Sequence, residues 1–319
     1  MASNEDTDIF NWKRPLELFS EKEVVKVCAP MVRYSKLPFR MLVRQYGCDL
    51  AFTPMIIANS FVASLKARDS EFTTCREDRP LIVQFAAHND VDFGNAAGIV
   101  SPYADGVDLN CGCPQRWAMA DGYGACLIKK PALVRDMVLQ ARNRVDRLDF
   151  TVSIKIRIHD DIRETVEYCR TMEAAGVSWI AVHGRTKEQR NQPVNLEAVK
   201  LIRENLSIPV VANGDIKSME DVNSVSTFTG VQGVMSARGM LQNPAMFTGL
   251  ENTPLQCMED WVAIALQYGT PFSIFHHHLM YMCERIMSKA ERRIFNSLPS
   301  TAAVLDYLRE NYTGQLDHG

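Results

Sequence analysis

An amide and two thiols follow one apolar run, in the segment Val107–Pro114. The β-branched and apolar start of this segment predicts a buried parallel strand, and its Gly and Pro residues end that strand. The strand therefore delivers Asn110 and Cys113 to its C-terminal tip. A free thiol has a pKa of ~8.5 and keeps its proton at neutral pH, so Cys113 suits a general acid. The thiolate activation that a nucleophile needs is not required.

Other interpretations of these cysteines stay open. Cys113 is also compatible with a small buried hydrophobic residue. A functional role is favoured because the following segment, Met119–Ala125, is rich in glycine and small residues and could move. Cys111 lies two residues from Cys113 and points the same way in an extended chain, but Gly112 between them leaves that direction open.

Charged and polar side chains also end several other apolar runs. Lys155 lies at such an end, and a buried ammonium needs a partner. One partner would be the anionic edge of a reduced flavin. Alternatively, Lys155 forms a Schiff base as in an aldolase, or it only reaches solvent. The amide of Gln84 suits hydrogen bonds to a flavin ring edge. His183 is either a contact to a cofactor phosphate or a structural histidine.

Two glycine-containing ends form a pair. The segments Asn213–Asp215 and Ser236–Gly239 end the seventh and eighth apolar runs. In a (β/α)8 barrel the loops after strands 7 and 8 form a recurrent phosphate site. Unhindered backbone N–H groups and the charge of Arg238 suit an anion there, whereas the alternative is that the glycines only turn the chain.

Eight apolar runs alternate with amphipathic segments along residues 21–250. The runs are Val24–Pro30, Asp49–Pro54, Leu81–Ala87, Val107–Gly112, Val152–Ile158, Trp179–Gly184, Val210–Asp215 and Gly233–Arg238. Helical patterns include Pro38–Tyr46, Leu133–Val145, Ile162–Ala175, Leu196–Asn205 and Met219–Val225. This alternation predicts parallel strands with crossover helices, and eight units favour a (β/α)8 TIM barrel. A doubly wound sheet is the alternative, but no GxGxxG motif follows the first run.

The two ends of the chain differ from this pattern. Residues 1–20 are expected to form a loose lead-in. Residues 255–319 predict a small all-helical domain packed on the barrel, with Phe275, Leu279, Met282 and Ile286 at helical spacing and a last helix at Thr301–Glu310. Three successive histidines, 276–278, diverge by about 100° each on a helix, so we expect no metal site there.

Composition restricts the environment and the partners. The chain has 319 residues, 46% of them hydrophobic, and a formal net charge of −3, so contacts to nucleic acid must use local basic patches. Nine cysteines without a CxxC pair argue against a disulfide scaffold or a zinc site and favour a reducing compartment. No apolar run is long enough for a membrane span, and no secretory or transit signal precedes the barrel. We expect a cytoplasmic or nuclear monomer.

The run ends, taken in order, resemble the tRNA-dihydrouridine synthase family. The matching pieces span residues 29–239: Ala29–Met31, Val83–Phe85, Asp108–Pro114, Gly122–Ala125, Lys155–Arg157, Val182–Thr186, Asn213–Asp215 and Ala237–Gly239. Asn-x-Gly-Cys-Pro with a distant His-Gly-Arg-Thr is the specific part. The chain is most similar to the eukaryotic branch that acts on D-loop uridines 20a and 20b.

The resemblance implies an FMN-binding barrel that reduces a uracil ring in tRNA. NADPH, or NADH, would supply the electrons, FMN would carry the hydride added at carbon 6, and Cys113 would protonate carbon 5. Asn110 and Arg185 would hold the target uracil, which must leave the base stack. The implied cofactor-binding residues are Pro30, Met31, Gln84, Lys155, His183, Asn213, Gly214, Asp215, Ala237, Arg238 and Gly239.

The family grips tRNA with a basic helical domain, and here that domain departs from the pattern. Residues 255–319 carry five Lys or Arg against seven Asp or Glu. Arg285, Lys289 and Arg292 are predicted on one helical side, either as contacts to RNA phosphates or as a solvated surface. Two other functions stay open: a flavin barrel acting on a free pyrimidine or another small molecule, and a non-catalytic tRNA-binding protein.

Overall fold

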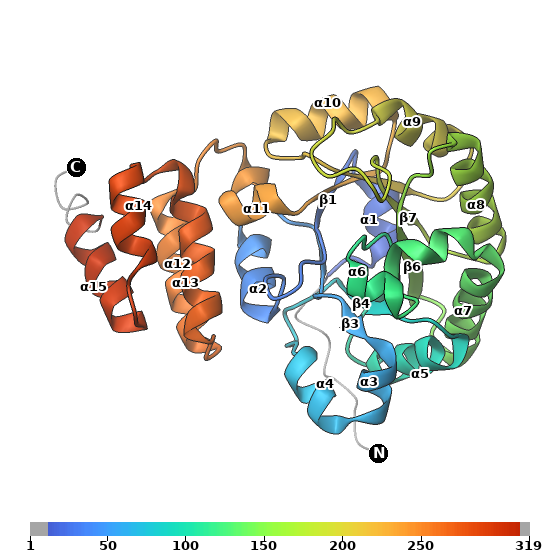
Figure 1. Ribbon diagram of the computed structural model, residues 1–319, viewed down its shortest axis with the longest axis horizontal. Helices are drawn as coiled ribbons and strands as arrows, with labels where there is room; N and C mark the ends of the chain where they lie inside the picture. The colour runs from blue at the N-terminus through green and yellow to red at the C-terminus, as the bar shows by residue number, and fades with distance from the viewer. Residues whose placement is uncertain (1–11, 313–319) are drawn as a thin grey trace, which may run out of the picture.

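Eight parallel strands close into a barrel in the computed structural model, which describes residues 12–312 (Figure 1). They are β1 (Val25–Cys28), β2 (Leu50–Phe52), β4 (Leu81–Ala86), β5 (Gly106–Cys111), β6 (Thr151–Arg157), β7 (Ile180–His183), β8 (Val210–Asn213) and β9 (Gly233–Ser236). Each pairs with the next, and β9 returns to β1. The short β3 (Ile56–Ile57) continues the second strand along β4. All eight predicted strands are confirmed.

Helices surround the barrel, each following one of its strands (Figure 1). They are α2 (Leu37–Gln45), α3 (Ala58–Ala63), α4 (Leu65–Glu71), α5 (Asp90–Val100), α6 (Arg116–Ala120), α7 (Pro131–Arg144), α8 (Ile162–Ala174), α9 (Leu196–Glu204), α10 (Met219–Thr229) and α11 (Arg238–Gln242). Side-chain caps fix several starts: Asp161, Asn195 and Ser218 accept backbone N–H groups of α8, α9 and α10, as capping residues do. All five predicted crossover helices are confirmed.

The prediction of a loose lead-in over residues 1–20 is wrong for residues 15–20. Residues 1–11 lie outside the described part, but α1 (Pro15–Glu21) is a helix that buries Leu18 and Phe19. The Phe19 ring lies 5.4 Å from the Trp179 ring at the start of β7. Together with Pro15, these buried apolar residues dock the helix on the barrel.

Four helices follow the barrel, as predicted: α12 (Leu255–Gln267), α13 (Phe272–Met282), α14 (Lys289–Asn296) and α15 (Thr301–Asn311). They form the unit at the left of Figure 1. The unit packs on α2, where the Phe39 ring lies 6.4 Å from that of Trp261 and 4.5 Å from that of His278. Tyr46 donates a 2.6 Å hydrogen bond to Asp260 of α12. One apolar core therefore continues from the barrel into these helices.

The three histidines of α13 contact different partners. His276 lies 2.9 Å from the carbonyl of Phe295, His277 lies 3.5 Å from the hydroxyl of Tyr34, and His278 is fully buried between Phe39 and Trp261. Their side chains diverge as the helical spacing predicts.

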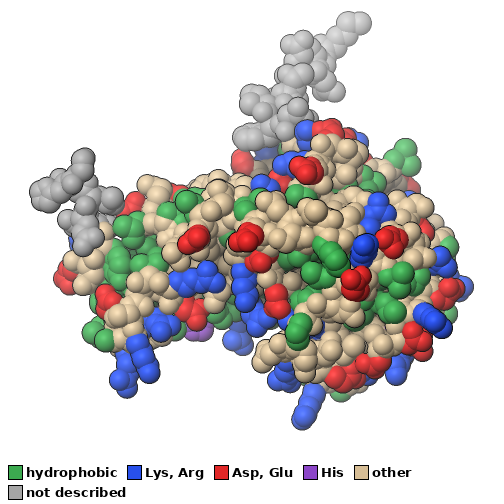
Figure 2. All heavy atoms as spheres, turned by 90° about the horizontal axis from the view of Figure 1, so that it is seen from above, with side chains coloured by type: hydrophobic (Ala, Val, Ile, Leu, Met, Phe, Trp, Pro, Cys, Tyr) green, Lys and Arg blue, Asp and Glu red, His purple; other side chains and the backbone are tan. Residues whose placement is uncertain are grey.

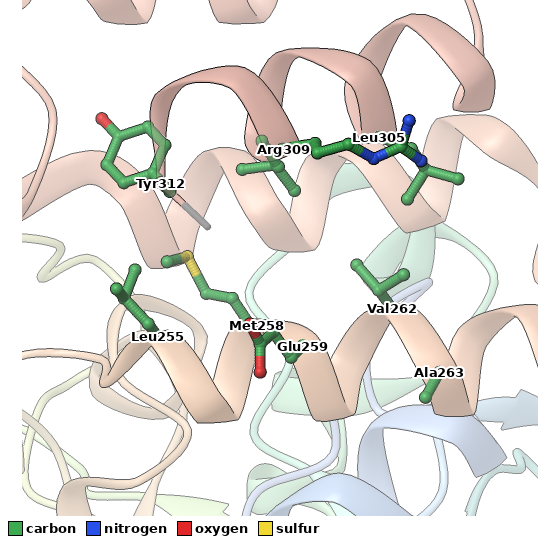
Figure 3. A pocket seen from close by; sticks show the side chains of 9 residues that line it. Leu255, Met258, Glu259, Val262, Ala263, Leu305, Arg309 and Tyr312 are labelled. Carbon is green, nitrogen blue, oxygen red and sulfur yellow. The ribbon is translucent and has the colours of Figure 1, made fainter. Parts of the chain in front are cut away.

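A cavity lies in this helical unit, away from the strand tips. It is an apolar groove of about 300 Å³ between α12 and α15, with Met258, Val262 and Leu305 on its walls (Figure 3). Its charged side chains are Glu259 and Arg309. No helix in residues 12–312 is long and apolar enough to cross a membrane.

Candidate active site

Strand register brings a layer of polar side chains together inside the barrel. Gln84 of β4, Asp108 of β5 and Ser153 of β6 are direct neighbours. Gln84 donates to Asp108 (2.8 Å) and so does Ser153 (2.7 Å). All three side chains are buried. Burial raises the pKa of Asp108 to about 6, although the two donated hydrogen bonds lower it.

A chain of hydrogen bonds leads from this layer to Cys113. Asn110 donates from Nδ2 to Oε1 of Gln84 (2.9 Å), and its Oδ1 accepts the backbone N–H groups of Cys113 (2.9 Å) and Gly112 (3.2 Å). Backbone N–H groups can only donate and an ionised carboxylate can only accept. The side-chain amides of Gln84 and Asn110 can therefore adopt only one orientation each, set by the Asp108 carboxylate at one end and the backbone N–H groups at the other. These hydrogen bonds also hold the loop that carries Cys113 against the barrel.

The thiol of Cys113 is partly exposed and packs on a small apolar cluster formed by Ala86, Ala118 and Tyr123. The following loop closes back on it, because Ala125 donates to the Cys113 carbonyl (2.9 Å). Gly124 has a φ of +69°, and a Cβ there would lie 2.6 Å from that carbonyl oxygen. Glycine is thus required where the loop passes Cys113.

Cys111 faces the other way. It is fully buried, and burial raises the pKa of its thiol well above the usual range, with the hydroxyl of Tyr168 on α8 as a neighbour. Side chains alternate along a strand, so Cys111 points to the helical layer while Asp108 and Asn110 point into the barrel. Only Cys113 of this pair reaches the mouth.

Lys155 lies beside Asn110 in register at the tip of β6. Burial is the main cause that lowers its pKa to about 8. The neighbouring Arg157 lowers it further, and Asp108 and Cys113 oppose the shift. Within residues 12–312 its ammonium has no hydrogen bond or ion pair. A cation held in this way favours an anionic ligand.

The tips of β7, β8 and β9 enclose a cavity of about 80 Å³. It is lined by His183, Arg185, Asn213, Gly214, Asp215, Ile216, Lys217, Met235, Ala237, Arg238 and Gly239. Asn213 is fixed by a 2.9 Å hydrogen bond to the carbonyl of Met235. Gly214 has a φ of +123°, and a Cβ there would lie 3.0 Å from the His183 ring. The two glycine-containing segments predicted as a pair therefore line one cavity.

Arginines and one carboxylate form a network at this cavity. Arg185 is 2% exposed and forks onto both carboxylate oxygens of Asp215. Arg238, which is exposed, reaches the same carboxylate at 3.5 Å. Burial lowers the pKa of His183 to about 2, and four cations, Lys155, Arg157, Arg185 and Arg238, add to this shift. His183 is therefore neutral at physiological pH.

The sequence model for dihydrouridine synthase (Dus) matches residues 27–308, nearly all of the barrel and the helical unit. The chain belongs to the dihydrouridine synthase family. Relatives named tRNA-dihydrouridine(20a/20b) synthase (NAD(P)+)-like are 64% identical in Mus musculus and 62% in Homo sapiens. Each alignment covers 94% of this chain, with 93% of the mouse and 95% of the human sequence. The Saccharomyces cerevisiae tRNA-dihydrouridine(20a/20b) synthase is 41% identical over 90% of this chain and 80% of its own.

Solved structures with the same fold are more distant. An amine oxidase acting on 6-hydroxypseudooxynicotine from Pseudomonas geniculata superimposes with a TM-score of 0.54 at 11% identity, over 70% of this chain. A 2-naphthoyl-CoA reductase gives 0.52 at 9% identity, over 70% of this chain. This chain spans about half the length of both, 46% and 49%. At these identities the likeness concerns the barrel fold alone.

The strand-end residues predicted as site residues thus occupy one end of the barrel. Pro30 and Met31 lie in the β1–α2 loop at the same end, where Ser35 accepts the backbone N–H of Met31 (2.9 Å). Asp108 was not among the predicted site residues, although it precedes Asn110 by two positions on the same strand face. The alternation of side chains along a strand could have identified Asp108 as a neighbour of Asn110.

Arg285, Lys289 and Arg292 do not lie on one helix, so that part of the prediction is wrong. Arg285 ends a 3-10 turn, η3 (Cys283–Arg285), and Lys289 begins α14 after the cap Ser288. The hydroxyl of Ser288 and the carboxylate of Glu291 form a capping box there, which a continuous helical pattern hides. Figure 2 shows basic and acidic side chains interspersed over the face that it draws.

Proposed function

We propose that this protein reduces D-loop uridines of tRNA, at positions 20a and 20b, to 5,6-dihydrouridine, with FMN as the bound cofactor and NADPH or NADH as the electron donor. The observation that carries the proposal is the identity of 62–64%, over 94% of the chain, to relatives named for that reaction. The mouth of the barrel supports it independently, because it combines a thiol, amide donors and a group of cations.

The residues at the mouth suit FMN. The cavity at β7–β9 combines the charge of Arg238 with backbone free of side chains at Gly214 and Gly239, which is what a phosphate needs. The half-buried Lys155, whose ammonium has a pKa lowered to about 8, suits the ring of a flavin that gains negative charge on reduction. We assign Pro30, Met31, Gln84, His183, Asn213 and Ala237 to the same cofactor. When bound, FMN would supply the hydride that adds to carbon 6 of uracil.

The chain's own groups account for the remaining steps. A base inside folded tRNA is stacked, so the uridine must rotate out into the mouth. Asn110 can donate one N–H to the uracil, because its second N–H and its Oδ1 already form hydrogen bonds within the protein. Cys113 donates its proton to carbon 5, where a negative charge develops after hydride addition. Loss of such a positioned acid costs ~100- to 10,000-fold in rate.

We also propose residues 21–250 as the catalytic domain and 255–319 as the tRNA-binding domain. The helical unit packs against α2, directly after the β1–α2 loop that borders the mouth. Arg285 and Lys289 are exposed on it, so they are available to RNA phosphates.

The decisive experiment has two measurements. The purified protein should be yellow and should release FMN on denaturation. With NADPH it should form dihydrouridine in an unmodified tRNA transcript that has uridine at 20a and 20b, and none when both positions are cytidine. Reduction of free uridine at a comparable rate would favour the small-molecule alternative, and colourless, inactive protein that still binds tRNA would favour the non-catalytic one.

A further inference from the structure

Almost all of the N–H donors of Arg185 bind acceptors within the protein. A guanidinium has five N–H donors and no acceptor. Its Nε donates to the carbonyl of Gln192 (2.5 Å), Nη1 donates to Asp215 (3.2 Å), and Nη2 donates to the second oxygen of Asp215. Nη1 also lies 3.3 Å from Nε2 of His183. One N–H is left over, so Arg185 has little to offer a bound base.

The contact with His183 determines a tautomer. Because an arginine nitrogen can only donate, Nε2 of His183 must accept. A neutral imidazole with Nε2 as acceptor carries its proton on Nδ1. Gly214 leaves room for this arrangement, since a Cβ there would lie 3.2 Å from Nε2 itself.

We propose that Arg185 and Asp215 are positioning residues that hold His183 as a neutral hydrogen-bond donor, protonated on Nδ1, at the mouth of the barrel. The carboxylate of Asp215 holds the guanidinium of Arg185 in place. The backbone of Asp215 has a φ of +55° in this arrangement. That conformation is uncommon outside glycine but tolerated by Asp and Asn. Asp215 thus acts on Arg185 rather than on a cofactor phosphate, which a carboxylate would repel.

The consequence concerns the acid of the reaction, so this inference rests on the proposed function. His183 faces Lys155, Arg157, Arg185 and Arg238, and all four oppose a positive charge on its ring. Held in this state, His183 can donate a hydrogen bond to a carbonyl or phosphate oxygen. It cannot deliver a proton at neutral pH, which leaves that role to another group.

The test is a long-range 15N–1H spectrum of the histidine rings in the purified 15N-labelled protein, with His183→Gln to assign the signals. In the wild type we expect His183 in the Nδ1-protonated neutral form, without titration between about pH 5 and pH 8. In Arg185→Met the Nε2 acceptor loses its donor, so the proton should redistribute toward Nε2 and titration should move toward the usual range.

Asp215→Asn suits the left-handed backbone at this position and replaces the carboxylate that contacts both Arg185 and Arg238 by a neutral amide. It should shift the same signals in the same direction by a smaller amount. Lys187→Met is the matched control: this lysine lies two residues from Arg185 but faces Glu188, so the His183 signals should not move. A wild-type His183 that is protonated on Nε2, or that titrates near pH 6.5, overturns the proposal, as does an unchanged tautomer in folded Arg185→Met. The spectrum does not depend on turnover, so an inactive enzyme with the expected tautomer would contradict the proposed function alone.

Discussion

Replacing Cys113 by alanine should separate flavin reduction from uracil reduction. The thiol is partly exposed, and the loop that carries it is held by backbone contacts to Asn110 and Ala125. These contacts use no sulfur, so Cys113→Ala should keep the fold, the bound FMN and the rate at which NADPH reduces the flavin. Reoxidation of the reduced flavin by tRNA should fall ~100- to 10,000-fold, because the charge that develops at carbon 5 loses its proton donor.

Cys111→Ala is the control that the structure provides. Its sulfur is fully buried on the helical side of β5. Its removal should lower the free energy of unfolding by roughly 1 kcal/mol, the value for about one buried methylene and a small cavity. It should leave turnover within a few-fold of the wild type, since nothing at the mouth changes.

The assay is single-turnover stopped flow. The enzyme is reduced anaerobically, mixed with unmodified tRNA and followed by flavin absorbance, and dihydrouridine is quantified per flavin. Near wild-type reoxidation by Cys113→Ala would refute the assignment of the acid. An inactive but folded Cys111→Ala would refute the argument from strand alternation.

Three further outcomes are expected. Lys155→Ala and Arg238→Ala should each weaken FMN retention, by about 1.5–3 kcal/mol per charge-assisted contact, measured as flavin occupancy on gel filtration; full occupancy in both would contradict the cofactor placement. The affinity of the wild type for reduced, anionic FMN should fall as pH rises through about 8, because burial lowers the pKa of Lys155 to about 8 and only the ammonium attracts an anion. The bound reduced flavin raises that pKa, so the midpoint should lie at or above 8, and Lys155→Arg should remove the dependence. Changing Arg285, Lys289 and Arg292 together to Ala should reduce the log–log salt slope of tRNA binding by about one per lost phosphate contact, whereas an unchanged slope would identify a solvated surface.

The barrel could be predicted from the sequence because each strand is an apolar run that ends in polar turn residues. Fully buried parallel strands have this pattern, and it located all eight to within a few residues. The helix α1 was missed because it has only seven residues, and packing on the barrel supplies most of its stability. The break before α14 was missed because helical spacing continues across it, and the Ser288 cap alone shows where a new helix begins.

The sequence predicted which strand-end side chains lie together at the mouth of the barrel, but not which of them are hydrogen-bonded to one another. Strand ends showed which side chains share the mouth, since parallel strands place their C-terminal tips together. Which atoms bond to which depends on the register between strands, and sequence does not carry that. Asp108 shows the difference: only the pairing of β4, β5 and β6 reveals that it anchors Gln84.

The groups at the mouth can be compared as sources of the proton for carbon 5. His183 is neutral at pH 7 because burial, together with four neighbouring cations, lowers its pKa to about 2. Asp108 is buried and accepts two hydrogen bonds, and burial raises its pKa only to about 6, so it is mostly ionised at pH 7. Lys155, with a pKa of about 8, does carry a proton at pH 7, and it is the one serious competitor of Cys113. The two make opposite predictions for Cys113→Ala, because a lysine acid would leave that variant active and make its rate fall as pH rises through about 8.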